Sequence, residues 1–273
     1  MHALHGNGKK GKNTNNTSHT PAKDFLAKVR YRFHNVHSIR DPTFRKVYLN
    51  QARSTADILL LAETNCDAHQ NPRTYESAWA QDWQKGQCFW ASAKGTYTPH
   101  SRGMALCIAD NIPFTNATQL YPIQDQLNIC GRILIVRAQL HHRDTVIIGF
   151  HGDNSAPASR LQQQHQANRA FSLDATLAAS ITQIINIINN LNIHSSTDII
   201  LMSDHNHRIN PSLDYHSPAG TTDIALPSTR TAFNTLLEKL QLVDTFRTLH
   251  PQTRESTRAN IQHGLVVSRS RID

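Results

Sequence analysis

Four apolar segments of this chain each end in polar residues that can bind a metal ion or a phosphate group. They are Val29–His34 before Asn35, Ile58–Leu61 before Glu63, Thr145–Phe150 before His151, and Ile199–Leu201 before Asp204 and Asn206. Continuous apolar runs of this length favour buried strands, and the alternation in the first favours a half-buried strand. Open α/β sheets build their sites outside the carboxyl ends of strands, so the pattern predicts an α/β fold with one shared polar site.

Asp204 and Asn206 form the most informative of these endings. Side chains two residues apart face the same way on an extended segment. They would place one anionic and one neutral oxygen together at a sheet edge, which suits a hard cation, an attacking water and a phosphate oxygen. A turn in which Asp and Asn cap the backbone is the alternative for an isolated pair. The three other strand ends favour the site.

The polar endings belong to an ordered series that resembles the endonuclease/exonuclease/phosphatase superfamily, which includes apurinic endonucleases, DNase I and sphingomyelinases. The series extends from about Tyr31 to Asp273. Its six motifs are Phe33–Val36, Leu61–Thr64, Ser101–Ala105, Gly149–His151, Ser203–Asn206 and Ser270–Asp273. The resemblance implies a DNase I-like α/β fold, a four-layer sandwich of two stacked mixed β-sheets flanked by helices.

Within that superfamily, the segments after Asn206 are most similar to the endonuclease domains of non-LTR retrotransposons. Asn210–Asp214 is similar to their "N…P.LD" stretch, and Leu242–Arg247 with His250-Pro251 is similar to "L.D.wR..hP". Arg258 stands where that pattern usually carries Trp. His151 stands at the usual Tyr position, as it does in the DNase I and sphingomyelinase branches.

The resemblance implies metal-dependent hydrolysis of a phosphodiester. Glu63 would bind Mg²⁺, for which Mn²⁺ can substitute, because Mg²⁺ accepts few protein carboxylates and keeps several waters. Asn35 would lie beside the ion and steady Glu63 or the phosphate. Asp204 would orient or deprotonate the attacking water, and Asn206 would hold a phosphate oxygen. His151 would contact the phosphate or help to protonate the leaving oxygen.

Each of these residues also has a purely structural alternative. Glu63 could form a strand-end salt bridge, Asn35 could cap a strand, and His151 could be a hydrogen-bonded histidine at a sheet edge. His37 stands where several relatives carry an acidic residue next to the metal. A cation at that position would oppose a second metal ion, so we expect a site for one.

The sequence ends at Asp273. In the superfamily, the Asp at this position hydrogen-bonds a catalytic His from a Ser-Asp-His motif one strand further on. We therefore expect Asp273 to be catalytic in an intact domain. We also expect a domain over residues 23–273 that lacks its last strand, with weak or no catalysis. A catalytically silent nucleic-acid-binding or vestigial relative is an alternative function. A phosphomonoesterase or phospholipase of the same fold is a further one.

Composition favours DNA as the partner. The formal charge is +8, and a basic protein attracts a polyanion. Residues 1–22 are polar and basic and predict a disordered tail. The chain contains neither a hydrophobic segment of signal-peptide length nor a membrane span. We expect an intracellular monomer, nuclear or in another compartment, that is not secreted and has no protein partner.

The four cysteines show no CxxC spacing, which favours buried free thiols over a zinc or redox site.

Three periodic segments predict helices between the strands. Asp41 and Pro42 form an N-cap and first-turn pair ahead of Phe44, Val47 and Leu49. A second helix is expected to begin at Ser172 and to carry Leu173, Leu177, Ile181, Ile184, Ile188 and Leu191 at intervals of three or four. A third carries Phe233, Leu236, Leu237 and Leu240. We expect all three apolar stripes to face the core.

Overall fold

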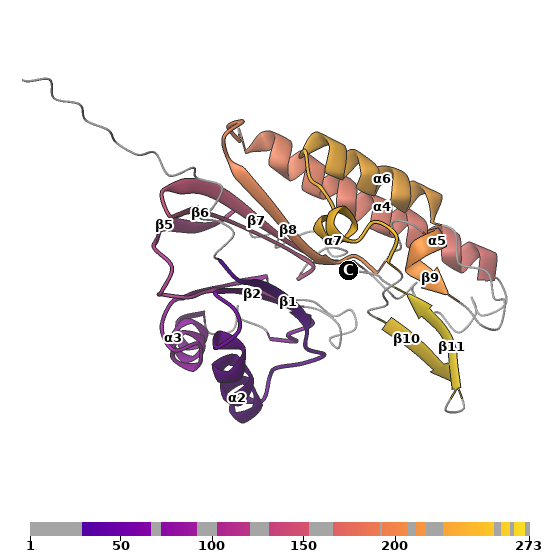
Figure 1. Cartoon of the computed structure of the whole chain (residues 1–273). Coiled ribbons are helices and arrows are strands. Elements are labelled where there is room, and N and C mark those ends of the chain that lie inside the picture. Colours follow the sequence, from indigo (N-terminus) through magenta and orange to yellow (C-terminus); the bar gives the residue numbers. More distant parts are fainter. Residues whose placement is uncertain are drawn as a thin grey trace, which may run out of the picture.

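Two four-stranded β-sheets, each covered by helices on its outer face, make up most of the structure (Figure 1). The computed structural model describes residues 29–66, 72–91, 103–120, 131–152, 166–191, 193–206, 211–216, 226–253, 258–262 and 265–270. The predicted tail over residues 1–22 and the candidate residue Asp273 lie outside these ranges. None of the helices within them is long and apolar enough to cross a membrane.

The first sheet has the order β1-β2-β4-β3, and the second has the order β5-β6-β7-β8. Their strands are β1 (Tyr31–Asn35), β2 (Ile58–Ala62), β3 (Gln87–Ala91), β4 (Met104–Ile108), β5 (Phe114–Leu120), β6 (Ile133–Leu140), β7 (Arg143–His151) and β8 (Asp198–Asp204). Both sheets are mixed. β1 pairs with β2 and β7 pairs with β8 in parallel, whereas the other neighbours are antiparallel. All four apolar segments singled out in the sequence are strands, as predicted.

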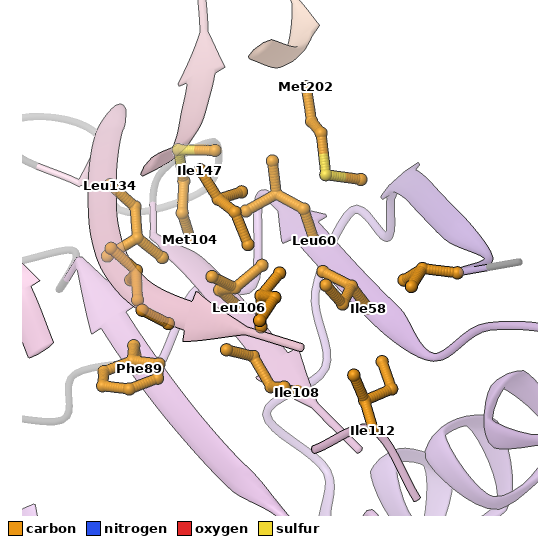
Figure 2. Packing of buried hydrophobic residues seen from close by; sticks show 14 residues of the cluster. Ile58, Leu60, Phe89, Met104, Leu106, Ile108, Ile112, Leu134, Ile147 and Met202 are labelled. Carbon is orange, nitrogen blue, oxygen red and sulfur yellow. The ribbon is translucent and has the colours of Figure 1, made fainter. Parts of the chain in front are cut away.

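The two sheets pack face to face through one apolar cluster (Figure 2). Leu60 and Met104 from the first sheet meet Leu134 and Ile147 from the second. Gly149 marks how closely the sheets approach, because a Cβ atom added there would lie 2.8 Å from Cδ1 of Leu60. Burial of apolar surface between the sheets is the main force that holds them together.

Helices cover the two outer faces. They are α2 (Pro42–Arg53) and α3 (Pro72–Asp82) on the first sheet, and α4 (Gln166–Asn190) and α6 (Pro227–Lys239) on the second. On the second sheet, Ile181 and Ile184 of α4 and Phe233 of α6 pack against Ile148 and Phe150 of β7. The layers are therefore helix, sheet, sheet and helix, which confirms the predicted four-layer sandwich.

Helix α2 begins as predicted, and of the three residues expected in the core only Leu49 is buried. Oδ1 of Asp41 accepts a hydrogen bond of 2.7 Å from the backbone N–H of Phe44, which confirms the N-cap. Phe44 and Val47, expected in the core, are 51% and 62% exposed. The buried positions are Arg45, Leu49 and Ala52. Arg45 can face inward because its Nε lies 2.7 Å from Oδ2 of Asp82 on α3.

Helix α4 begins at Gln166, so the predicted start at Ser172 is wrong. Residues 166–171 contain two alanines and no Gly or Pro, and nothing in them ends a helix. Four residues of the predicted apolar stripe are buried as expected, namely Leu177, Ile181, Ile184 and Ile188. Leu191 is partly buried against the same cluster, and the side chain of Leu173 lies outside the described residues. In α6, Phe233 and Leu236 are also buried as predicted.

A smaller antiparallel sheet of order β10-β11-β9 follows in the second half of the chain. Its strands and the short helices near it are α5 (Pro211–Asp214), β9 (Tyr215–His216), α7 (Thr245–Leu249), β10 (Arg258–Gln262) and β11 (Leu265–Ser270). The guanidinium of Arg247 on α7 pairs with the buried carboxylate of Asp214. Asp244 caps α7, because its Oδ1 accepts a hydrogen bond of 3.0 Å from the backbone N–H of Arg247.

The thiols of Cys66, Cys88 and Cys107 are free and buried, as predicted. The fourth cysteine, Cys130, lies outside the described residues.

Candidate active site

The register of the two parallel strand pairs brings the predicted site residues together. Asn35 ends β1 opposite Ala62, so it lies next to Glu63, which follows β2. His151 ends β7 opposite Asp204 at the end of β8. Nδ2 of Asn35 donates to Oε1 of Glu63 at 3.0 Å and lies 3.5 Å from Oδ2 of Asp204, which links the sheets. The site therefore lies where the carboxyl ends of two strand pairs meet.

Glu63 is the centre of the cluster and is only 5% exposed. Its Oε1 accepts from Asn35 and lies 3.2 Å from Nε2 of His151. Its Oε2 lies 2.9 Å from Nδ1 of His37, whose side chain is 81% exposed. Burial raises the pKa of Glu63, but the hydrogen bonds from His151, Asn35 and His37 outweigh burial and lower it to about 2. Glu63 is therefore ionised throughout the physiological pH range.

His151 is completely buried at the end of β7. Its Nε2 faces Glu63, while its Nδ1 lies 3.2 Å from Nη1 of Arg132, the residue before β6. Nη1 of Arg132 also donates to the carbonyl oxygen of Gly152 at 3.1 Å. The histidine is thus held from both sides, by a carboxylate and by a guanidinium.

Asp204 and Asn206 form a tight turn after β8, so the predicted extended arrangement of this pair is wrong. The strand ends at Asp204, and Asn206 has a φ of 49°. The backbone N–H of Asn206 donates to Oδ1 of Asp204 at 3.1 Å. Both side chains nevertheless turn to the site, because Nδ2 of Asn206 donates to the Gly152 carbonyl at 2.9 Å and lies 3.4 Å from Nε2 of His151. His205 turns away and stacks on Phe233 of α6, with ring centroids 4.8 Å apart.

Several residues around the site have backbone conformations that L-amino acids seldom adopt. His37, Glu63, Asn65 and Asn206 have φ values of 52°, 54°, 54° and 49°. Such conformations persist only where the surroundings determine them, and they gather at ligand-binding sites. The hydrogen bonds of Glu63 and Asn206 supply that support here.

The chemistry of these side chains fits a single hard cation. Mg²⁺ is usually bound through one or two carboxylates and keeps several waters. Oε2 of Glu63 is the oxygen with fewer contacts, since its only partner within the described residues is the exposed ring of His37. Asn35 turns its amide nitrogen to Glu63 and its oxygen to the backbone N–H of His37, so it holds the carboxylate in place. Within the described residues, no group of three or more His, Cys, Asp or Glu side chains could hold a metal ion.

The sequence pattern does not predict the roles of Arg132 and Gly152. A lone arginine before an apolar run gives no sign that it will be buried beside a strand end. The Gly152 carbonyl is a backbone group and leaves no signal of its own. His37, which the resemblance places next to the metal, contacts Oε2 of Glu63, the proposed metal ligand.

An open groove of about 580 Å³ lies outside this cluster, between α4 and α6. It is lined by residues such as Thr182, Asn186, Thr231 and Lys239 and by no carboxylate or histidine. It therefore lacks the carboxylates and histidines that the cluster around Glu63 provides.

Comparison of the sequence with protein-family models and with curated proteins finds no match. The fold, in contrast, is shared with solved structures. An AP endonuclease from Archaeoglobus fulgidus is 17% identical with a TM-score of 0.55, over 87% of this chain and 79% of that one. The APE2 catalytic domain from Xenopus laevis is 17% identical with a TM-score of 0.58, over 89% and 80%. A 3′-5′ exonuclease from Neisseria meningitidis is 16% identical with a TM-score of 0.52, over 88% and 86%.

At these identities the likeness establishes the fold alone. The described sheets and helices match the architecture of these proteins along most of the chain. This chain has the DNase I-like α/β sandwich fold.

Proposed function

We propose that this protein is a metal-dependent phosphodiesterase that nicks DNA. The observation that carries the proposal is the convergence of Glu63, His151, Asp204 and Asn206 at one edge of the two sheets, with Glu63 buried and ionised. A phosphodiester is a poor electrophile with a poor leaving group, so its hydrolysis requires a positioned base and charge stabilisation. The four side chains supply both kinds of group.

The proposed roles follow from what each side chain offers. Asp204 orients the attacking water or accepts its proton through a carboxylate that is 8% exposed. Asn206 donates from its amide to a phosphate oxygen. His151, whose Nε2 faces Oε1 of Glu63 at 3.2 Å, would donate to the same group or to the leaving oxygen by turning from that carboxylate. Asn35 lies between Glu63 and Asp204 and fixes their separation.

Glu63 would hold a single Mg²⁺ or Mn²⁺ through Oε2. The bound ion would supply charge neutralisation at the phosphate and polarise the leaving oxygen. The exposed ring of His37 can rotate away from Oε2 without disturbing the core, because its side chain is 81% exposed. The depressed pKa of Glu63 supports this role, since the ligand must be ionised to bind a cation.

DNA is the proposed substrate for two reasons. The chain carries a formal charge of +8, which favours a polyanionic substrate. Its fold is also that of solved structures described as AP endonucleases and as a 3′-5′ exonuclease. The finer hypothesis, nicking for retrotransposition, is supported by two segments. These segments, Asn210–Asp214 and Leu242–Arg247, are similar to the retrotransposon endonuclease patterns, and their Asp214 and Arg247 form an ion pair.

The test is nicking of supercoiled plasmid with Mg²⁺ or Mn²⁺, by the wild type and by Asp204→Asn. The substitution keeps the shape of the side chain and removes the base, so we expect a loss of about 10²-fold or more. EDTA should abolish nicking, and either metal should restore it. Asp110→Asn is the matched control, because this carboxylate lies on the surface in a salt bridge with Arg53.

Equal nicking by the wild type and Asp204→Asn would exclude this site from the reaction. Folded wild type that binds DNA but does not nick it would instead favour the silent nucleic-acid-binding alternative. In that case the logarithm of the affinity should fall linearly with the logarithm of the salt concentration.

A further inference from the structure

Arg132 is among the most deeply buried charged residues of the described chain, with 2% of its surface exposed. Its Nη1 lies 3.2 Å from Nδ1 of His151 and 3.1 Å from the Gly152 carbonyl oxygen. Burial of a cation is unfavourable unless hydrogen bonds compensate for the lost water. The hydrogen bonds of Arg132 to His151 and to the Gly152 carbonyl must therefore offset the cost of burying its guanidinium.

The first of these bonds determines where His151 carries its proton. A guanidinium has five donors and no acceptor, so Nδ1 of His151 must be the acceptor and carries no hydrogen. In the neutral ring the proton is then on Nε2. This atom lies 3.2 Å from Oε1 of Glu63, which is ionised and can only accept. Arg132 and Glu63 thus require the same tautomer from opposite sides of the ring. Nδ2 of Asn206, which lies 3.4 Å from Nε2, is also a donor, so this longer contact is not a hydrogen bond in that tautomer, and the amide donates to the Gly152 carbonyl at 2.9 Å instead.

The second bond extends to Asn206. The Gly152 carbonyl accepts from Nη1 of Arg132 and, at 2.9 Å, from Nδ2 of Asn206. The backbone N–H of Gly152 donates to the carbonyl oxygen of Asp204 at 2.8 Å, which fixes the peptide itself. The Gly152 carbonyl also sets the orientation of the Asn206 amide, because a carbonyl oxygen can accept a hydrogen bond from Nδ2 but not from Oδ1.

We propose that Arg132 is a positioning residue of the phosphodiesterase site. It holds His151 in the Nε2–H tautomer directed at Glu63, and it holds the Gly152 carbonyl that orients Asn206. The consequence for catalysis rests on the proposed function, whereas the tautomer of His151 does not.

The catalytic consequence is tested by Arg132→Met, which keeps an unbranched side chain and removes the donors. We expect kcat for plasmid nicking to fall at least about tenfold with little change in KM, and Arg132→Lys to recover part of the loss. Arg137→Met is the matched control, since Arg137 lies on the same segment but pairs with Asp144, outside the site. It should nick like the wild type. Thermal unfolding of each variant establishes that it is folded.

A double-mutant cycle with His151→Phe tests whether Arg132 acts through the histidine. We expect the two losses in kcat to be less than additive, by at least about fivefold, as for residues in one hydrogen-bonded network. Additive losses would overturn the proposed route. Wild-type kcat in Arg132→Met, beside an inactive Asp204→Asn, would overturn the positioning role and leave the proposed function intact.

The tautomer is measured directly by ¹⁵N NMR of the histidine rings at neutral pH, with His151→Phe used to assign the resonances. We expect Nδ1 of His151 to be unprotonated and Nε2 protonated, and the Nδ1 resonance to shift in Arg132→Met but not in Arg137→Met. A proton on Nδ1 in the wild type, or an unshifted resonance in Arg132→Met, would overturn the proposal. This measurement needs no cleavage, so it decides the arrangement even if the protein does not nick DNA.

Discussion

Nε2 of His151, the last residue of β7, lies 3.2 Å from Oε1 of Glu63, which follows β2 in the other sheet. This contact joins the sheets at the edge where Asn35 makes a second link, from Glu63 to Asp204. The candidate site is thus also a structural connection between the halves of the sandwich. Substitutions in the candidate site should therefore affect stability as well as activity, and measuring unfolding and nicking for each variant separates the two effects.

Ionised Glu63 should stabilise the fold in a pH-dependent way. Its pKa in the folded protein is about 2, below the ordinary value of 4.5, so the stabilising effect is complete above pH 4.5 and lost as the pH falls to about 2. The free energy of unfolding of the wild type, relative to Glu63→Gln, should therefore decline by about 1–2 kcal/mol over that window, with allowance for nearby solvent. Urea unfolding at a series of pH values measures it. A difference that does not change with pH would contradict the assignment.

Two glycines near the site should respond differently to substitution by alanine. A Cβ atom at Gly149 would lie 2.8 Å from Cδ1 of Leu60, the end of a flexible side chain, so we expect a loss of about 1–3 kcal/mol with nicking retained. At Gly152 it would lie 2.3 Å from the backbone oxygen of His205, which cannot move without shifting the end of β8. Gly152→Ala should therefore abolish nicking as well. Denaturant unfolding and plasmid nicking of both variants test this contrast, and an active Gly152→Ala would refute it.

Asn206→Gly should separate stability from activity at one position. Glycine adopts the φ of 49° without strain, so the variant should be within about 1 kcal/mol of the wild type in stability. Nicking should nevertheless fall, because the amide that faces His151 is lost. Gln241→Gly is the control, since Gln241 has a φ of 52° in an exposed turn outside the site. Unimpaired nicking by Asn206→Gly would remove the amide from the mechanism.

The strands were predictable because the pattern of apolar and polar side chains in consecutive residues indicates which strand faces are buried. Ile58–Leu61 is apolar without a break, and Tyr31, Phe33 and Asn35 alternate with exposed residues, as β1 does in the structure. Parallel pairing then placed the strand ends together, which is why Asn35 could be associated with Glu63. The pattern of neighbouring residues does not predict burial where a side chain's partner lies far away in the sequence. Arg45 is buried because of Asp82, and no periodicity in α2 reveals that.

At the candidate site, too, local sequence predicts some features and not others. The polar residues at the strand ends could be proposed from their chemistry. The hydrogen bonds that hold them come from residues such as Arg132, which no sequence motif marks. Arg132 contacts His151 because β6 and β7 are antiparallel partners, with Ile133 opposite Phe150. The turn at Asn206, expected from the sequence only as the alternative, forms because β8 ends at Asp204, whereas side-chain alternation with period 2 requires the strand to continue.

The buried ion pair between α2 and α3 should matter far more for stability than an exposed one. The Arg45 and Asp82 side chains are 9% and 11% exposed, and the guanidinium also lies 5.5 Å from the ring centroid of Trp79. Asp82→Ala leaves this cation buried without its carboxylate, so we expect a loss of about 3 kcal/mol or more. Asp110→Ala is the comparison, because Asp110 is 47% exposed beside Arg53 and should lose less than about 1 kcal/mol. Chemical denaturation of both variants measures the difference, and equal losses would mean that Arg45 finds water when Asp82 is removed.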